Sequence, residues 1–253
     1  MRLALVPRAS DSDEVMPEPR ALAILQSLLL KWFADRPTRI YEAGGGSLSY
    51  LPTELLEKAD ITAVDIDPDQ IKNNRYARTR ICGDIQEQKF PPDSFDLVVC
   101  YFVLEHLERP HQAMQRFFDA LTPGGLMFIA APNARSFTGL VTKYTPHWFH
   151  VWIFRTVFRD KTAGQPGRGP FPTIYHPLVL PERLIEFAKR HGYEVVYFKK
   201  FESVQLGKLR QRYPLLGKLL STFICALEFV ARMPLREGDY HILLGKPAAR
   251  PKP

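Results

Sequence analysis

The stretch IYEAGGGSLS, residues 40–49, constrains the fold more than any other part of the chain. An acid, Glu42, closes an apolar run, and three glycines follow at residues 44–46. Glycines let the backbone turn sharply and approach a ligand where a Cβ would clash. We expect a helix from Ser49 to Lys58, capped by Ser49, whose free N–H groups face an anion on the loop. A plain glycine turn between a strand and a helix explains the same residues, so the loop alone does not identify a ligand site.

The rest of the chain alternates short apolar runs with segments of helical periodicity, which predicts a doubly wound α/β fold with a mostly parallel sheet. We expect strands at 39–42, 61–65, 79–82, 95–101, 126–132, 193–198 and 240–247, with a TPGG turn at 122–125. We expect helices at 19–33, 49–58, 69–75, 110–121, 181–191 and 214–233, after a loose N-terminal arm at 1–17.

Polar residues follow the expected strands one after another. These positions hold Glu42–Gly46, Asp65, Asp84, Tyr101–His106 and Pro132–Asn133. Ligands of open α/β sheets bind outside the carboxyl ends of the strands. The sequence therefore predicts one ligand site at this edge of the sheet.

Two classes of cofactor use a glycine loop followed by an acid about 20 residues later. Gly44, Gly46 and Ser49 approximate the G-x-G-x-x-G pattern of a dinucleotide site, and Asp65 suits a ribose diol in either class. Glu42 would repel a pyrophosphate but suits a ligand that carries an ammonium group. An NAD oxidoreductase is therefore the less favoured alternative.

Taken in order, five segments resemble the class I S-adenosylmethionine-dependent methyltransferases, in particular the small-molecule (type 11) group. They are EAGGG (42–46), AVDID (63–67), CGDI (82–85), DSFDLVVCYFVLEHLERP (93–110) and LTPGGLMFIAAPN (121–133). The resemblance covers residues 38–133 well and 176–198 and 240–247 in outline. Leu48 departs from it, because many members carry another glycine there.

The resemblance implies a seven-stranded Rossmann-like sheet, S-adenosyl-L-methionine as cofactor, and a set of residues that hold it. Asp65 would bind the ribose hydroxyls, Ile66 would pack on the adenine, and Glu42 would face the methionine ammonium. The full implied set is Glu42, Ala43, Gly44, Gly45, Gly46, Asp65, Ile66, Asp84, Ile85, Cys100 and Tyr101.

Methyl transfer needs a base only where the acceptor atom is protonated. His106 is the candidate, because it follows the fourth strand at the cofactor edge; a residue that only shapes the pocket is the alternative. His147 and His150 lack a nearby cysteine or carboxylate, so we expect no metal site.

Two insertions are expected to select the acceptor. Residues 134–177 read as an aromatic cap in which Trp148, Trp152, Arg155 and His176 contact a small, hydrophobic or lipid-like, in part anionic acceptor. Residues 199–238 carry the apolar helix 214–233, in which nine residues separate Lys218 from Glu228, too few to span a membrane. Core packing, a homodimer contact and peripheral membrane attachment all explain this helix. Residues 1–37 form the arm and first helix, 38–133 the cofactor core, and 178–198 with 239–247 complete the sheet.

Charge and cysteine content leave one more alternative open. Residues 1–132 carry 14 Lys+Arg and 19 Asp+Glu, whereas residues 133–253 carry 20 and 8. The basic C-terminal half could bind the phosphate backbone of RNA, but no RNA-binding module accompanies it, so a nucleic-acid partner is disfavoured. Three unpaired cysteines, with Cys82 and Cys100 expected to be buried, and no signal-peptide pattern favour a cytoplasmic protein. The sequence predicts a methyltransferase, O-methylating by preference, with an RNA methyltransferase or a non-methylating enzyme or scaffold of the same fold as alternatives.

Overall fold

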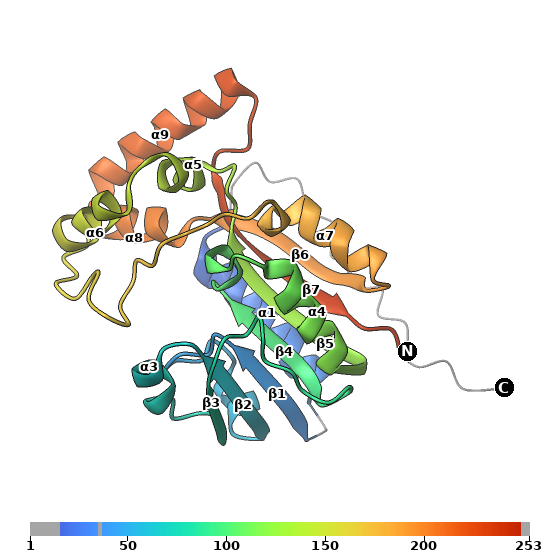
Figure 1. The fold of residues 1–253 in the computed structure, drawn as a ribbon. Coiled ribbons are helices and arrows are strands. Elements are labelled where there is room, and N and C mark those ends of the chain that lie inside the picture. The colour runs from blue at the N-terminus through green and yellow to red at the C-terminus, as the bar shows by residue number, and fades with distance from the viewer. Residues whose placement is uncertain (1–15, 35–36, 249–253) are drawn as a thin grey trace.

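The computed structural model describes residues 16–34 and 37–248, so most of the predicted arm lies outside the described residues. A seven-stranded sheet runs through the molecule in the order β3-β2-β1-β4-β5-β7-β6 (Figure 1). All neighbours pair parallel except β7, which is antiparallel to β5 and to β6. The strands are β1 Thr38–Ala43, β2 Ala59–Asp65, β3 Thr79–Cys82, β4 Phe95–Tyr101, β5 Leu121–Pro132, β6 Glu194–Glu202 and β7 Glu237–Gly245. The predicted doubly wound, mostly parallel sheet is confirmed.

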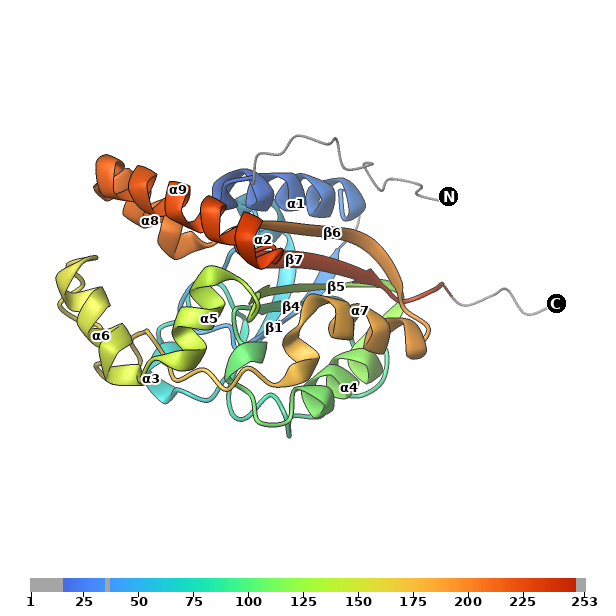
Figure 2. The same cartoon turned by 90° about the horizontal axis from the view of Figure 1, so that it is seen from above.

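Helices cover both faces of the sheet (Figure 2). They are α1 Glu18–Trp32, α2 Thr53–Leu56, α3 Pro68–Lys72, α4 Pro110–Ala120, α5 Phe137–Tyr144, α6 His147–Thr156, α7 Pro181–Arg190, α8 Val204–Arg212 and α9 Pro214–Ala231, with 3-10 turns at Leu104–His106 and Pro177–Val179.

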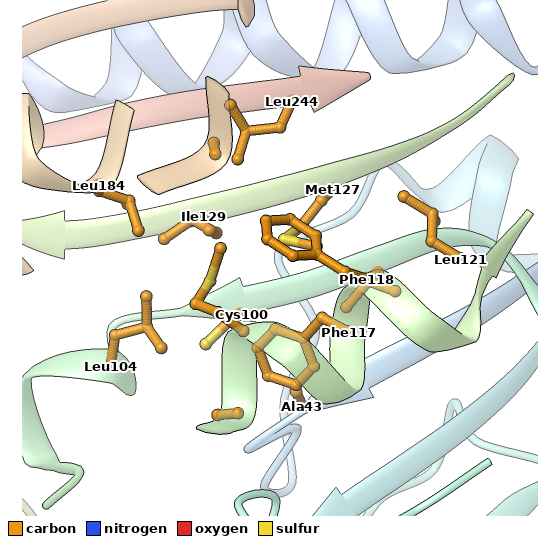
Figure 3. Packing of buried hydrophobic residues seen from close by; sticks show 14 of the residues in the cluster. Ala43, Cys100, Leu104, Phe117, Phe118, Leu121, Met127, Ile129, Leu184 and Leu244 are labelled. Atoms are coloured by element: carbon orange, nitrogen blue, oxygen red, sulfur yellow. The ribbon is translucent and has the colours of Figure 1, made fainter. Parts of the chain in front are cut away.

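Alternate residues of the strands supply the two halves of the core. Leu97 and Val99 of β4 pack with Leu25 and Leu29 of α1 on one face. The other face joins β4 and β5 to α4 and α7, and Figure 3 shows Phe117 of α4 against this layer. Each fully buried leucine or phenylalanine contributes about 1.5–3 kcal/mol. The central strands are therefore held from both sides, and their carboxyl ends are fixed relative to one another.

The two insertions gather at one end of the sheet, where α5, α6, α8 and α9 lie together (Figures 1 and 2). This is the edge at which β1, β2 and β4 end, because the polypeptide leaves β5 into α5 and leaves β6 into α8. Helix α8 follows β6 directly and was not predicted from the sequence.

Three local predictions are wrong. The helix expected from Ser49 is only the four-residue α2, which begins at Thr53 after Pro52, so no helix N-terminus stands directly behind the glycine loop. Cys82 is exposed, because β3 is the edge strand of the sheet, and only Cys100 is buried as expected. The TPGG segment is part of β5, where the pairing with β4 shifts register between Phe95 and Leu97.

Candidate cofactor and active site

The glycine loop is held between two strands by its own backbone. The N–H groups of Gly44 and Gly45 donate to the Val64 carbonyl of β2 at 2.8 and 3.2 Å. Gly44 has φ +71°, and a Cβ on it would lie 2.5 Å from Cγ2 of Val103. Only glycine combines this conformation with so close an approach to the segment after β4. Leu48, the departure from the family pattern, is 63% exposed and does not fill the loop.

Asp65 ends β2 and faces this loop. Its carboxylate accepts hydrogen bonds from the Gly46 N–H at 2.8 Å and the Asp67 N–H at 2.9 Å. A carboxylate offers about four acceptor positions, so two remain for the hydroxyls of a ribose. Ile66 beside it is 73% exposed and offers an apolar surface where an adenine would stack. This corner of the sheet fits an adenosine group.

Asp84 and Ile85 follow β3 but differ in what they offer a ligand. Asp84 is half-buried and accepts from the backbone and side-chain N–H groups of Gln86 at 2.8–3.1 Å. The Ile85 side chain is buried in the hydrophobic core. Only the backbone of Ile85 is therefore available to an adenine edge. Ala43 and Cys100 are likewise buried core residues, which leaves their backbone groups for binding.

Glu42 is the buried acid of the site. It is 3% exposed, accepts a hydrogen bond from the Ser49 hydroxyl, and its Oε2 has no hydrogen-bond partner among the residues described. Burial raises the pKa of Glu42 to about 7. Ser49 thus holds the acid in place and does not cap a helix.

Tyr101, at the end of β4, is locked by aromatic and polar contacts. Its ring stacks on Tyr50 with centroids 3.8 Å apart, and its hydroxyl donates to Glu18 of α1 at 3.1 Å. These contacts fasten the first turn of α1 and the loop before α2 over the end of β4. The sequence did not predict Tyr50 or Glu18 as site residues.

Two further carboxyl groups, Glu105 and Asp239, are buried at the same edge. Burial raises the pKa of Glu105 to about 8 and that of Asp239 to about 7, and the charge of Asp239 adds to the rise at Glu105. Oε2 of Glu105 has no hydrogen-bond partner within the described ranges. Asp239 accepts the Val204 N–H at 3.0 Å. Sequence analysis missed both, although Glu105 stands beside His106 in the LEHL motif.

Glu42, Glu105 and Asp239, here called the buried acids, make this edge of the sheet suited to a cation. Glu105 and Asp239 influence each other, whereas Glu42 on β1 is separated from β7 by β4 and β5. In the part of the chain that is described, no lysine or arginine forms an ion pair with any of them; the one ionic contact is the 3.8 Å approach of His106 to Glu105. Buried carboxyl groups require a compensating charge or a proton. S-adenosylmethionine carries a sulfonium and an ammonium group, so the orphaned acceptors fit that cofactor.

His106 projects from the turn after β4 and is held in one orientation. Its Nδ1 lies 2.7 Å from the Pro172 carbonyl. A carbonyl oxygen only accepts, so Nδ1 carries the hydrogen and Nε2 of the neutral ring keeps its lone pair. Burial lowers the pKa of His106 below its ordinary value. The geometry therefore presents a neutral imidazole whose Nε2 keeps its lone pair and lies 3.8 Å from Oε1 of Glu105.

The loop between α6 and α7 closes over two parts of this edge. Gln70 of α3 donates to the Gly167 carbonyl at 2.5 Å and accepts from Ser47 at 2.8 Å. Farther along, the N–H groups of Ile174 and Tyr175 donate to the Glu105 carbonyl at 2.9 and 3.3 Å. The loop thus contacts both the corner of the sheet near Asp65 and the His106 turn.

The predicted acceptor residues are placed less centrally. Trp148 and Trp152 lie on α6 and are 68% and 53% exposed, so they do not enclose an apolar chamber. The Arg155 Nε donates to the Ala163 carbonyl at 2.9 Å and ties α6 to its own loop. His176 caps the turn Pro177–Val179 by accepting the Leu178 N–H at 3.1 Å. The contacts of Arg155 and His176 are structural ones within the cap.

No group of three or more potential metal ligands occurs among residues 16–34 and 37–248. A shallow hollow of about 830 Å³ lies at the opposite edge of the sheet and contains none of the predicted site residues.

Known proteins resemble this chain in both sequence and fold. The methyltransferase domain family matches residues 42–129. The methyltransferase str3 of Strobilurus tenacellus is 27% identical over 165 residues, 57% of this chain and 58% of its own length. The ubiquinone biosynthesis O-methyltransferase of Caulobacter sp. strain K31 is 28% identical over 159 residues, 53% of this chain and 61% of its own length. The chain thus spans about three-fifths of these curated relatives.

Solved structures share the fold at low sequence identity. A methyltransferase from Archaeoglobus fulgidus described as dependent on S-adenosylmethionine superposes with a TM-score of 0.53 at 19% identity, covering 89% of this chain and 94% of its own. The cyclase SpnF superposes with a TM-score of 0.55 at 17% identity, covering 94% and 86%. Residues 42–129 therefore match the methyltransferase domain family, and the ordered motifs, the sheet and these likenesses support a class I S-adenosylmethionine-dependent methyltransferase.

Proposed function

We propose that this protein transfers a methyl group from S-adenosylmethionine to a hydroxyl group of a hydrophobic acceptor. The buried acids carry the proposal, because three buried carboxyl groups with no lysine or arginine partner among the described residues lie at the edge where Asp65 and the glycine loop fit an adenosine. The likeness to an O-methyltransferase of ubiquinone biosynthesis supports oxygen as the acceptor atom.

Each residue would act by binding or by moving a proton. Asp65 would hold the ribose hydroxyls, and Glu42 would hold the ammonium group with Ser49 fixing its carboxylate. The cofactor supplies an electrophilic methyl group, so the protein has only to align and deprotonate the acceptor. Nε2 of His106 would take the proton from the acceptor hydroxyl, since Nδ1 is occupied by Pro172.

The surroundings of His106 favour an apolar acceptor. The Phe171 ring packs against the imidazole at 5.9 Å between centroids and is 49% exposed. Ile174, also on this segment, is 48% exposed. Half-exposed apolar side chains beside a basic nitrogen suit an aromatic alcohol with an alkyl tail. They replace Trp148 and Trp152 as the acceptor-contacting residues of the proposal.

Calorimetric titration with S-adenosylhomocysteine tests the cofactor site. We expect micromolar binding by the wild type and at least tenfold weaker binding by Asp65→Asn, because a charged acceptor of two hydroxyls is lost. Asp60→Asn is the matched control, since Asp60 is an exposed acid near the other end of the same strand. Equal affinity of the Asp65 and Asp60 variants, or no binding by the folded wild type, would refute the site.

Mass spectrometry of reactions with paired acceptors tests the chemistry. Each pair presents a phenol and the corresponding aniline on one alkyl-tailed ring, and S-adenosylhomocysteine is quantified together with the methylated product. Methylation of the phenol supports the proposal, and exclusive methylation of the aniline contradicts oxygen as the acceptor atom. Cofactor binding without S-adenosylhomocysteine formation across a broad acceptor panel would favour a non-methylating role. Methylation of RNA alone would favour the nucleic-acid alternative.

A further inference from the structure

Helix α9 is apolar along its length and yet lies on the outside of the molecule. It has 18 residues with a mean hydropathy of 1.6, and 11% of them are buried. Only Gly217 and Ile224 are fully buried, which rules out the core helix that the sequence allowed. Leu215, Leu219, Phe229 and Val230 are 74%, 61%, 86% and 78% exposed.

The side of α9 that faces away from the protein carries almost no charge. Lys218 and Glu228 are the only charged residues of α9, and Glu228 lies on the side of Ile224 and pairs with Arg236. Helical spacing places Leu215, Leu219 and Phe229 opposite the buried pair. A helix at the surface of a water-soluble domain normally carries its charged residues on this outer face. The outer face of α9 is therefore suited to an apolar environment.

The topology excludes a helix α9 that crosses a membrane. By length and composition alone α9 could span a bilayer, which corrects the expectation drawn from the spacing of Lys218 and Glu228. However, β6 before it and β7 after it are hydrogen-bonded neighbours in one sheet, and the nine-residue α8 is too short to return across a bilayer. Both ends of α9 must stay on one side. Gly217 also packs closely on α8, where a Cβ would lie 2.6 Å from the Arg210 Cα.

The elements around α9 are basic. Residues 134–177 contain six Lys+Arg and one acid, and residues 204–233 contain five and one. All eleven of these lysines and arginines are exposed. The Tyr213 hydroxyl, at the start of α9, donates to the Val157 carbonyl at 3.3 Å and so joins α9 to the end of α6. Exposed Trp148 and Trp152 on α6 add the aromatic residues that favour a headgroup layer.

We propose that α9 and α6 dock the protein on an anionic lipid surface, with the outer face of α9 buried at the level of the headgroups and upper acyl chains. An apolar helix face supplies the insertion, and the surrounding arginines and lysines supply attraction to anionic lipid. A second protein copy would satisfy the apolar face but gives no use for the basic border. This docking does not depend on methyl transfer, although it would place the acceptor site beside a bilayer.

Co-sedimentation with sucrose-loaded vesicles tests the docking without any enzymatic readout. The vesicles are 3:1 phosphatidylcholine to phosphatidylglycerol, with pure phosphatidylcholine for comparison. We expect binding to the anionic vesicles that weakens several-fold in 0.5 M NaCl. The double variant Leu219→Glu with Phe229→Glu should bind at least tenfold more weakly, because two apolar side chains no longer insert.

Two controls separate insertion from charge and from folding. Lys189→Glu, at an exposed position on α7, lowers the net charge by two units, as the glutamate double variant does, and should retain binding. Leu219→Ser with Phe229→Ser should lose binding without adding charge. Absence of wild-type binding to anionic vesicles, or full binding by both double variants, would overturn the proposal. A micromolar dimer that these variants abolish, without vesicle binding, would assign α9 to a subunit contact.

Discussion

Replacing Glu42 with glutamine should change stability and cofactor affinity in separable ways. Burial raises the pKa of Glu42 from its usual 4.5 to about 7. Between these values the folded protein holds a proton that the unfolded chain releases, so the stability of the ligand-free protein falls as pH rises. A shift of this size corresponds to about 2.5 kcal/mol of unfolding free energy lost between pH 5 and pH 8.5. The neutral side chain of Glu42→Gln removes this loss.

Urea unfolding of the ligand-free protein at the two pH values measures the effect. The wild type should lose about 2.5 kcal/mol more than Glu42→Gln over this interval, whatever constant cost the buried amide adds to the variant. Glu57→Gln is the matched control, because Glu57 is an exposed acid at the end of α2. It should follow the wild type. Equal pH slopes for wild type and Glu42→Gln would show that this carboxyl group is not desolvated.

Titration of the same variant with S-adenosylhomocysteine at pH 8 measures the second effect. Loss of a charge-assisted contact to the ammonium group should weaken binding about tenfold or more. A variant that flattens the pH slope but binds with wild-type affinity would place the ammonium group elsewhere, and the assignment of Glu42 to the cofactor would fail.

Three further substitutions test the base, the loop and the cap. His106→Gln should lower kcat about a hundredfold and leave cofactor affinity unchanged. The wild-type rate should fall below neutral pH as His106 becomes protonated, because its lowered pKa keeps the base neutral at pH 7, and this fall should be absent in the variant. A variant with the wild-type pH profile would refute the role of His106 as base. Gly44→Ala should destabilise by about 2 kcal/mol more than Gly192→Ala in urea unfolding, since both have positive φ but only Gly44 meets Val103; equal losses would refute that contact. Gln70→Ala should speed tryptic cleavage after Arg168 several-fold, because the hydrogen bond from Gln70 to the Gly167 carbonyl is lost. The same cleavage rate in Gln70→Ala and in the control Gln88→Ala would mean that this hydrogen bond does not hold the loop.

Much of the fold follows from local sequence pattern. The strands β1, β2, β4 and β5 are short apolar runs ended by polar residues, and α1, α4 and α7 keep their helical periodicity. The edge position of β3 was invisible in this pattern, because an apolar run does not reveal whether a second neighbour will cover it. Cys82 is exposed for that reason. In the sequence, Ser49 is equally compatible with a helix cap and with a hydrogen-bond partner of a buried acid, and only the fold brings it to Glu42.

The candidate site divides in the same way. The sequence by itself determined the glycine loop, Asp65, Asp84 and the His106 turn, because each follows a strand directly and parallel strands end at one edge. Tertiary structure alone decided which acids are buried at this edge, since Asp239 reaches it only through the reversed direction of β7. It also decided that α9 lies outside the core, because its apolar composition fits burial in protein and burial in lipid equally well. Local pattern fixes which residues end a strand, whereas long-range packing fixes which charges and apolar faces remain without a partner.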